Sequence, residues 1–157
     1  MSFQGKKSSH AAMLAADRAD ALLQYSALCY RTRRDTIEVL LITSRTTRRW
    51  IVPKGWPMPD RTPAEAALRE AYEEAGVQGV ADDRCIGAFS YLKTTKDDLI
   101  VPCVAMVFPV KVKKLAAKFP ERKERRRAWF SRKKAASLVQ EPELAELLRG
   151  FDPRKLR

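Results

Sequence analysis

The first clear pattern of hydrophobic and polar residues along the chain consists of short apolar segments separated by charged turns. Tyr25–Tyr30 and Ile37–Ile42 are rich in β-branched, aromatic and aliphatic residues, and the charged segment Arg31–Asp35 lies between them. This arrangement predicts a β-hairpin. Trp50–Val52 predicts a further short strand, which ends at Pro53.

A helix with explicit ends follows an irregular loop, Lys54–Arg61. Thr62 is a good N-cap, Pro63 suits the first helical turn, and Glu65 completes a capping box with Thr62. Gly76 suits the left-handed position that ends many helices. Small apolar residues recur at helical spacing between these ends and predict a narrow buried stripe. The residues of this stripe are Ala64, Ala67, Leu68, Ala71 and Ala75.

The second half of the chain predicts the rest of a sheet and two C-terminal helices. Ile86–Leu92 and Leu99–Val112 read as strands, and the second is long and almost uniformly apolar, as expected of a central strand. Arg127–Phe130 predicts a short final strand. Arg132–Val139 and Glu143–Phe151 predict the helices.

Length and composition indicate one compact domain. The chain has 157 residues, of which 45% are hydrophobic and 32% are charged, and this is enough apolar material for a single core. We expect residues 1–23 to form a flexible or partly helical leader and residues 24–157 to form the domain.

The charge balance narrows the possible partners. Thirty-one Lys and Arg residues against 19 Asp and Glu give a net charge of +12, which attracts nucleic acid, anionic membranes and phosphate-rich small molecules. His10 is the only histidine, and this excludes a histidine-dependent triad and a multi-histidine zinc site. The chemistry must therefore use carboxylates, lysines, arginines or a metal ion held by oxygen.

Cysteine usage and hydropathy indicate the compartment. Cys29, Cys85 and Cys103 lie far apart in apolar runs, so we expect buried thiols in a reducing environment. No apolar run approaches the roughly 18 residues of a membrane span, and the N-terminus lacks a signal-peptide pattern. We expect a cytoplasmic protein without membrane association. The oligomeric state does not follow from the sequence.

Three glutamates crowd the second half of the predicted helix. Glu70, Glu73 and Glu74 share an arc of about 100°, and the apolar stripe is expected on a different side of the helix. Because like charges at i,i+4 repel, Glu70 facing Glu74 is unfavourable unless a positive group lies between them. Mg²⁺ suits that position, since it prefers carboxylate oxygens and bridges to phosphates. Arg69 is spaced to pair with Glu73. Taken alone, such a cluster is more often a solvated helix face.

The segment around these glutamates resembles the Nudix box. That pattern is Gly, five residues, Glu, seven residues, Arg-Glu, an apolar residue, any residue, Glu-Glu, any residue, Gly and an apolar residue. The residues in register are Gly55, Arg69, Glu70, Ala71, Glu73, Glu74, Gly76 and Val77. Arg61 stands where the pattern has its first glutamate, which puts an accessory carboxylate in doubt and leaves the main cluster complete.

Resemblance to the Nudix hydrolase family implies an α/β/α sandwich with a mixed central sheet over roughly residues 24–151. It also implies metal-dependent hydrolysis of a diphosphate linkage in a small polyphosphorylated substrate. Such substrates include diadenosine polyphosphates, inositol pyrophosphates and nucleoside diphosphate derivatives. By position, the carbonyl of Gly55 and the carboxylates of Glu70, Glu73 and Glu74 would hold one to three Mg²⁺ ions, with Mn²⁺ as the alternative.

The branch of the family is indicated by the PKGWPM loop, the strand with Pro102 and Cys103, and the RRAWFSRKKAASLV segment. These look similar to bacterial proteins related to diphosphoinositol polyphosphate phosphohydrolases and diadenosine polyphosphate hydrolases. Lys54 and Arg61 are candidate phosphate contacts, and Trp56 is a candidate to stack on a base. Each also has an ordinary interpretation as a solvated or rim residue.

The general base and the exact function stay open at this stage. Glu70 is one candidate base, and Asp97, Asp98 and Glu121 are candidates from downstream loops. Two alternative functions are an RNA-directed Nudix protein, which removes a 5′ diphosphate or binds RNA, and a non-catalytic nucleotide-binding module. The lack of an RNA-binding motif disfavours the first. The complete glutamate trio disfavours the second.

Overall fold

The computed structural model describes residues 21–156 and consists of a mixed eight-stranded sheet between helices. The leader expected at residues 1–23 falls almost wholly outside this range, as does His10. The strands are β1 (Leu22–Arg33), β2 (Thr36–Thr43), β3 (Trp50–Ile51), β4 (Lys54–Gly55), β5 (Val77–Ala81), β6 (Gly87–Thr94), β7 (Ile100–Leu115) and β8 (Arg127–Ser131). The helices are α2 (Pro63–Ala75), α3 (Arg132–Leu138), α4 (Pro142–Gly150) and the 3₁₀ turn η1 (Pro153–Leu156).

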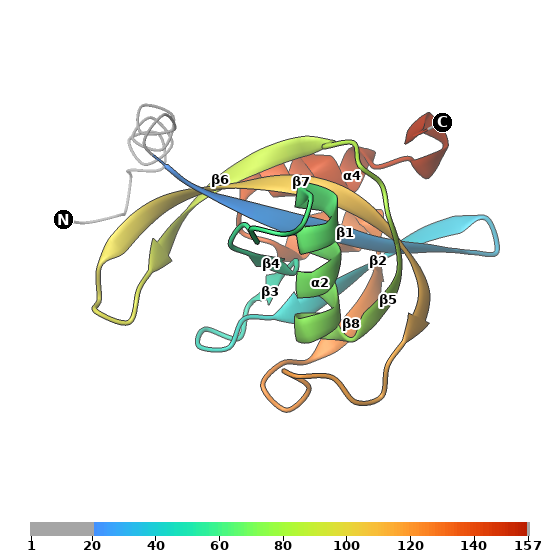
Figure 1. Cartoon of the computed structure of the whole chain (residues 1–157). Helices are drawn as coiled ribbons and strands as arrows, with labels where there is room; N and C mark the ends of the chain where they lie inside the picture. The colour runs from blue at the N-terminus through green and yellow to red at the C-terminus, as the bar shows by residue number, and fades with distance from the viewer. Residues whose placement is uncertain (1–20, 157) are drawn as a thin grey trace.

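The helices cover both faces of the sheet, with α2 on one face and α4 on the other (Figure 1). The apolar stripe of α2 packs on one core, which includes Ala67 and Ala71 of the helix and Phe108 of β7. The second core includes Leu144 and Leu148 of α4. Because β1 and β7 are parallel and the other pairs are antiparallel, the sheet is mixed. The predicted α/β/α sandwich is confirmed.

The central strand β1 holds the sheet together and positions the loop before α2. It pairs with β7 from Leu22 opposite Cys103 to Tyr30 opposite Lys111. It also pairs with β4, which places Gly55 opposite Tyr25. The loop predicted at residues 54–61 therefore begins with two residues of strand. This pairing is long-range and leaves no local pattern from which it could be predicted.

Two further details of the sheet differ from the sequence prediction. The hairpin turn is tighter than expected, because Arg34 and Asp35 adopt positive φ angles of 52° and 63° and the strands run up to them. Strand β5 was not predicted at all. It has five residues and pairs with the end of β7, and a side chain at Gly79 would collide with the carbonyl of Lys111.

Helix α2 has the predicted ends. The Thr62 hydroxyl accepts a hydrogen bond from the Glu65 amide at 3.2 Å, and the Glu65 carboxylate accepts one from the Thr62 amide at 2.8 Å. Gly76 ends the helix with φ of 70°, a left-handed conformation that favours glycine. These local bonds fix the register of α2 and therefore the direction of its glutamates.

Replacing Gly76 with alanine is expected to lower the free energy of unfolding by about 1–3 kcal/mol, the usual cost of a non-glycine residue held in this backbone region. The added Cβ would also lie 2.6 Å from the Phe119 ring and 2.7 Å from Arg127 Nη1. Urea denaturation monitored by circular dichroism measures the change. Gly150→Ala, at the end of α4, is the control, because a Cβ there meets nothing within 4 Å. Equal stability of the two variants would contradict the prediction.

The cysteines are only partly as predicted. Cys29 and Cys103 are buried, and burial raises the pKa of both thiols. Cys85 is exposed, so its predicted burial is wrong. It lies in the connection between β5 and β6, directly after the charged residues Asp82–Arg84. Over residues 21–156, no helix has the length and hydropathy needed to cross a membrane.

Candidate active site

The second half of α2 brings two of the predicted carboxylates together against β4. Glu74 is only 6% exposed, so the expectation that all three glutamates lie apart from the apolar stripe is wrong for this residue. Its Oε1 accepts a hydrogen bond from the Lys54 amide at 3.4 Å. Glu70 lies one turn earlier and interacts with Glu74 through its side chain.

The backbone of Gly55 lies directly against the Glu70 side chain. A Cβ at this position would overlap the Glu70 carboxylate, so the backbone of β4 approaches the helix as closely as a residue without a side chain allows. Gly55, Glu70 and Glu74 are therefore in one place, as the sequence predicts. Carboxylate oxygens, which a hard cation prefers, are concentrated there beside the backbone of Gly55.

Glu73 is oriented differently from the other two glutamates. Its Oε2 lies 2.7 Å from Arg69 Nε, which is the predicted i,i+4 pair, and both side chains are partly exposed. Consequently no group of three acidic, cysteine or histidine side chains within residues 21–156 is arranged as a ready metal site. The assignment of Glu73 as a metal ligand stays a prediction, and it requires Glu73 to leave Arg69.

Sequence reasoning missed Arg125, whose side chain is only 9% exposed. It comes from the loop between β7 and β8. Its Nε lies 2.9 Å from Glu121 Oε1 and its Nη2 lies 3.8 Å from Glu74 Oε1, while Nη1 donates to the Thr43 carbonyl at 3.1 Å. One arginine within a run of basic residues carries no sequence signal that sets it apart. Arg125 is the internal cation of this carboxylate cluster.

The β7–β8 loop also satisfies the carbonyls at the end of α2. The Glu121 amide donates to the Glu73 carbonyl at 3.0 Å and the Ala116 amide to the Gly76 carbonyl at 2.8 Å. Arg127, the first residue of β8, donates from Nη1 to the Ala75 carbonyl at 2.7 Å. The last turn of a helix leaves such groups unpaired. The loop and the start of β8 together therefore supply the donors that basic residues in the last turn of α2 would otherwise provide.

The ionised forms of the Glu70 and Glu74 carboxyl groups are unfavourable unless a further cation is bound. Burial raises the pKa of Glu74 to about 8, although Arg125 acts in the opposite direction. Burial and the charge of Glu73 raise the pKa of Glu70. Both residues also lie toward the negative end of the helix dipole. A divalent cation bound between these oxygens would offset all of these costs, so the residues present fit a metal ion.

The predicted substrate residues lie at different places around this cluster. Lys54 is half-buried with Nζ 4.9 Å from the centre of the Tyr91 ring, and burial lowers its pKa to about 8 although Glu74 raises it. Trp56 is 44% exposed. Arg61 is exposed and its charge acts on Glu65 of the capping box, so the structure does not bring it to the carboxylates.

Of the downstream candidates for the general base, only Glu121 is placed at the cluster. Its charge raises the pKa of both Glu70 and Glu74. Asp97 and Asp98 lie in the turn between β6 and β7, and Figure 1 shows this turn well away from α2. The structure therefore favours Glu121 over these two aspartates.

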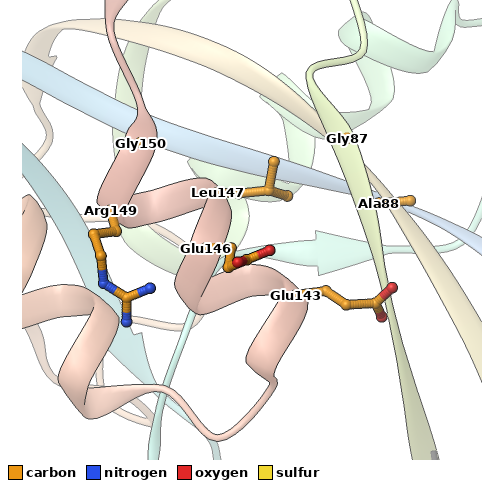
Figure 2. Close-up of a pocket in the computed structure, with 7 residues that line it drawn as sticks. All are labelled: Gly87, Ala88, Glu143, Glu146, Leu147, Arg149 and Gly150. Atoms are coloured by element: carbon orange, nitrogen blue, oxygen red, sulfur yellow. The ribbon is translucent and has the colours of Figure 1, made fainter.

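A separate shallow hollow of about 580 Å³ lies between β6 and α4, on the other face of the sheet (Figure 2). Its lining includes Glu143, Glu146 and Arg149. Glu143 already accepts a hydrogen bond from the Ser90 amide at 2.8 Å. None of the predicted site residues lines this hollow, and its two carboxylates suit a polyphosphate poorly.

The structure places a helix with clustered carboxylates against the glycine of β4, on one face of a mixed sheet. This arrangement is the one expected of α/β proteins with a Nudix box. The NUDIX domain model matches residues 22–151, and the chain belongs to this family. The resemblance noted in the sequence is thereby confirmed.

Individual relatives support the same family. Nudix hydrolase 12, mitochondrial, of Arabidopsis thaliana is 36% identical over 129 residues, which cover 77% of this chain and 64% of that protein. Diphosphoinositol polyphosphate phosphohydrolase 3-alpha of Mus musculus is 35% identical over 117 residues, covering 73% of this chain and 67% of that protein. The chain thus spans about two thirds of the length of these curated relatives.

A solved structure shows the same fold. The C. elegans Ap4A hydrolase superposes with a TM-score of 0.61 and 21% identity, covering 82% of this chain and 94% of that chain. At this identity the likeness supports the arrangement of strands and helices.

Proposed function

We propose that this chain hydrolyses a diphosphate linkage in a small polyphosphorylated molecule, with Mg²⁺ or Mn²⁺ bound at the carboxylates of α2. Family membership supports the reaction class. The observation that carries the proposal is the Gly55 backbone pressed against the Glu70 carboxylate beside the buried Glu74. The names of the mouse and nematode relatives point to diphosphoinositol polyphosphates and Ap4A as substrate types to test.

The metal ligands in this proposal are the carbonyl of Gly55 and the carboxylates of Glu70, Glu73 and Glu74. When bound, a divalent ion there supplies charge neutralisation of the diphosphate and a more acidic water. Arg125 holds the side chains of Glu74 and Glu121 in place. Glu70 and Glu121 are the two candidates to accept the proton of the attacking water. Lys54 extends from the same strand as Gly55 and contacts a substrate phosphate.

The strongly basic composition supports an anionic substrate. A net charge of +12 increases the encounter rate with a densely charged polyphosphate, and this effect declines as salt is added. The same positive charge would also attract RNA. RNA processing and a purely binding role are therefore the alternatives that the experiment must separate.

Phosphate release from a substrate panel tests the proposal. We expect hydrolysis of at least one small substrate among diadenosine polyphosphates, inositol pyrophosphates, nucleotide sugars and nucleoside triphosphates. We expect none from RNA with a 5′ triphosphate, and loss of activity in chelator with recovery on adding Mg²⁺ or Mn²⁺. Release from RNA alone would favour the RNA-directed alternative. If no phosphate is released from any substrate with either metal, the non-catalytic nucleotide-binding module is the alternative that remains.

A further inference from the structure

Two loops that are far apart in the sequence lie side by side near the C-terminal end of α2 (Figure 1). They are the β2–β3 loop, residues 44–49, and the β7–β8 loop, residues 116–126. Arg48 of the first loop donates from Nη1 to the carbonyl of Glu124 in the second at 3.1 Å. Arg45 Nη1 lies 3.4 Å from Glu124 Oε1. The two loops therefore form one continuous surface.

Positive charge dominates this surface. The two loops contain eight basic residues against two acidic ones. Four exposed basic side chains lie on the turn that ends at Glu124 and on the loop that contacts it, and we call them the loop patch: Arg45, Arg48, Arg122 and Lys123. Arg45 forms ion pairs with Glu124 at 3.4 Å and Glu121 at 4.0 Å. Within residues 21–156 the other three members form no ion pair, so most of the charge is available to a ligand.

Hydrogen bonds to the backbone hold both loops in place. The Thr43 amide donates to the Arg126 carbonyl at 3.0 Å, and the Arg126 amide donates to the Thr43 hydroxyl at 2.9 Å. Within the β2–β3 loop, the Ser44 amide donates to the Arg49 carbonyl at 2.8 Å and the Arg48 amide to the Ser44 carbonyl at 3.2 Å. A surface that is ordered before binding loses less conformational entropy when a ligand binds.

The side chains of the loop patch suit phosphate groups. Three of the four are arginines, whose guanidinium groups donate paired hydrogen bonds that match phosphate oxygens. Among residues 21–156, the large hydrophobic side chains that are exposed all lie outside these two loops. Phe119, the aromatic residue of the loops, is partly buried with Arg127 Cζ 4.9 Å from its ring centre. The two loops, which are described in full, therefore offer neither an apolar wedge for a membrane nor a platform for stacked bases.

We propose that the loop patch is a docking surface for the phosphate backbone of a nucleic acid, contacted without regard to base sequence. Such contacts are made by exposed arginines and lysines, and they release counterions from the polymer. The inference goes beyond the proposed function and does not depend on it, because the four side chains have no part in the metal or diphosphate site. RNA and DNA share this backbone chemistry, so both are probed.

Fluorescence anisotropy tests the docking surface, with labelled RNA and DNA strands of one mixed sequence of about 20 nucleotides, in EDTA and about 0.1 M NaCl. Arg48→Gln/Lys123→Gln, with one change in each loop, is expected to weaken binding about tenfold. It should also reduce the slope of log Kd against log [NaCl] by about 1.4, the value for two phosphate contacts on a single strand. Lys133→Gln/Lys134→Gln, at two exposed lysines of α3, removes the same charge elsewhere and should weaken binding less than about threefold.

Two results would overturn the docking surface: no binding of either strand to the original protein, or equal losses in the two double variants, which would show that overall charge alone attracts the strands. Co-sedimentation with phosphatidylserine vesicles, without binding of either strand, would also overturn it. Circular dichroism checks that the variants fold, and Arg122→Gln/Lys123→Gln tests the same surface if Arg48→Gln disturbs its loop. A protein that binds both strands through the loop patch but hydrolyses nothing in the substrate panel would reject the proposed function and retain the docking surface.

Discussion

Glu74→Gln is expected to lower kcat by about three orders of magnitude, and also to make the metal-free protein more stable at neutral pH. Loss of one carboxylate removes a ligand and a charge from the cation site, and a loss of several kcal/mol of transition-state stabilisation gives a decrease of this size. Steady-state kinetics at saturating Mg²⁺ measures it. Glu146→Gln, on the exposed side of α4, is the control and should retain full activity.

The stability gain follows from the raised pKa of Glu74. Its carboxyl titrates near 8 in the folded protein against a reference value of 4.5, so the unfolded chain loses this proton first as the pH rises. Stability without metal should therefore fall between about pH 4.5 and pH 8 and then level off. Glutamine has no such titration, and its amide can keep the contact with the Lys54 backbone.

Urea denaturation in chelator at pH 5 and pH 8 separates these effects. We expect Glu74→Gln to exceed the original protein by about 2–4 kcal/mol at pH 8 and by much less at pH 5. A variant that is less stable than the original protein at both values would show that the Glu74 charge is already fully compensated, by Arg125 above all. Wild-type kcat in this variant would remove the assignment of the site.

Gly55→Ala is expected to lower activity at least 100-fold while the fold is retained. Gly55 has no positive φ angle, so alanine can adopt its backbone conformation, and the only cost is the overlap of the new Cβ with the Glu70 carboxylate. Displacing that carboxylate separates Glu70 from Glu74, and small misplacements of catalytic groups reduce rates by about this factor.

Circular dichroism and kinetics on Gly55→Ala and Gly150→Ala together test this. A Cβ at Gly150 meets no atom within 4 Å, so this variant should match the original protein in both measurements. If Gly55→Ala keeps normal activity, the close approach of β4 to α2 has no part in catalysis. If it unfolds, thermal melting shows that directly, and Mn²⁺ affinity of the soluble fraction then decides whether the site is lost.

The sequence predicts the parts of the site that local rules determine. The capping box at Thr62 and Glu65 and the left-handed Gly76 set the ends of α2, and helical spacing then brings Glu70 and Glu74 together. The mixed sandwich followed from the Nudix resemblance. The close approach of Gly55 to Glu70 is consistent with the match to the box, although the box does not state why a glycine is required.

What could not be predicted depends on contacts between distant segments. Glu74 reads as a surface residue on its own helix, and its burial comes from Lys54 of β4 and Arg125 of the β7–β8 loop. Arg125 stands among other arginines with no pattern to distinguish it. Cys85 borders the apolar residues of β6 but follows the charged segment Asp82–Arg84, and it is exposed. Each of these outcomes was decided by tertiary packing.

The bonds from the β7–β8 loop to the end of α2 have a consequence for protein synthesis. A nascent chain that has left the ribosome only as far as β7 contains every glutamate of α2 but lacks Glu121, Arg125 and Arg127. The carbonyls of Glu73 and Ala75 then lack the donors from Glu121 and Arg127, and Glu74 has no guanidinium beside it. The carboxylate cluster of α2 therefore acquires its guanidinium and these donors only after the motif that defines the family has already been made.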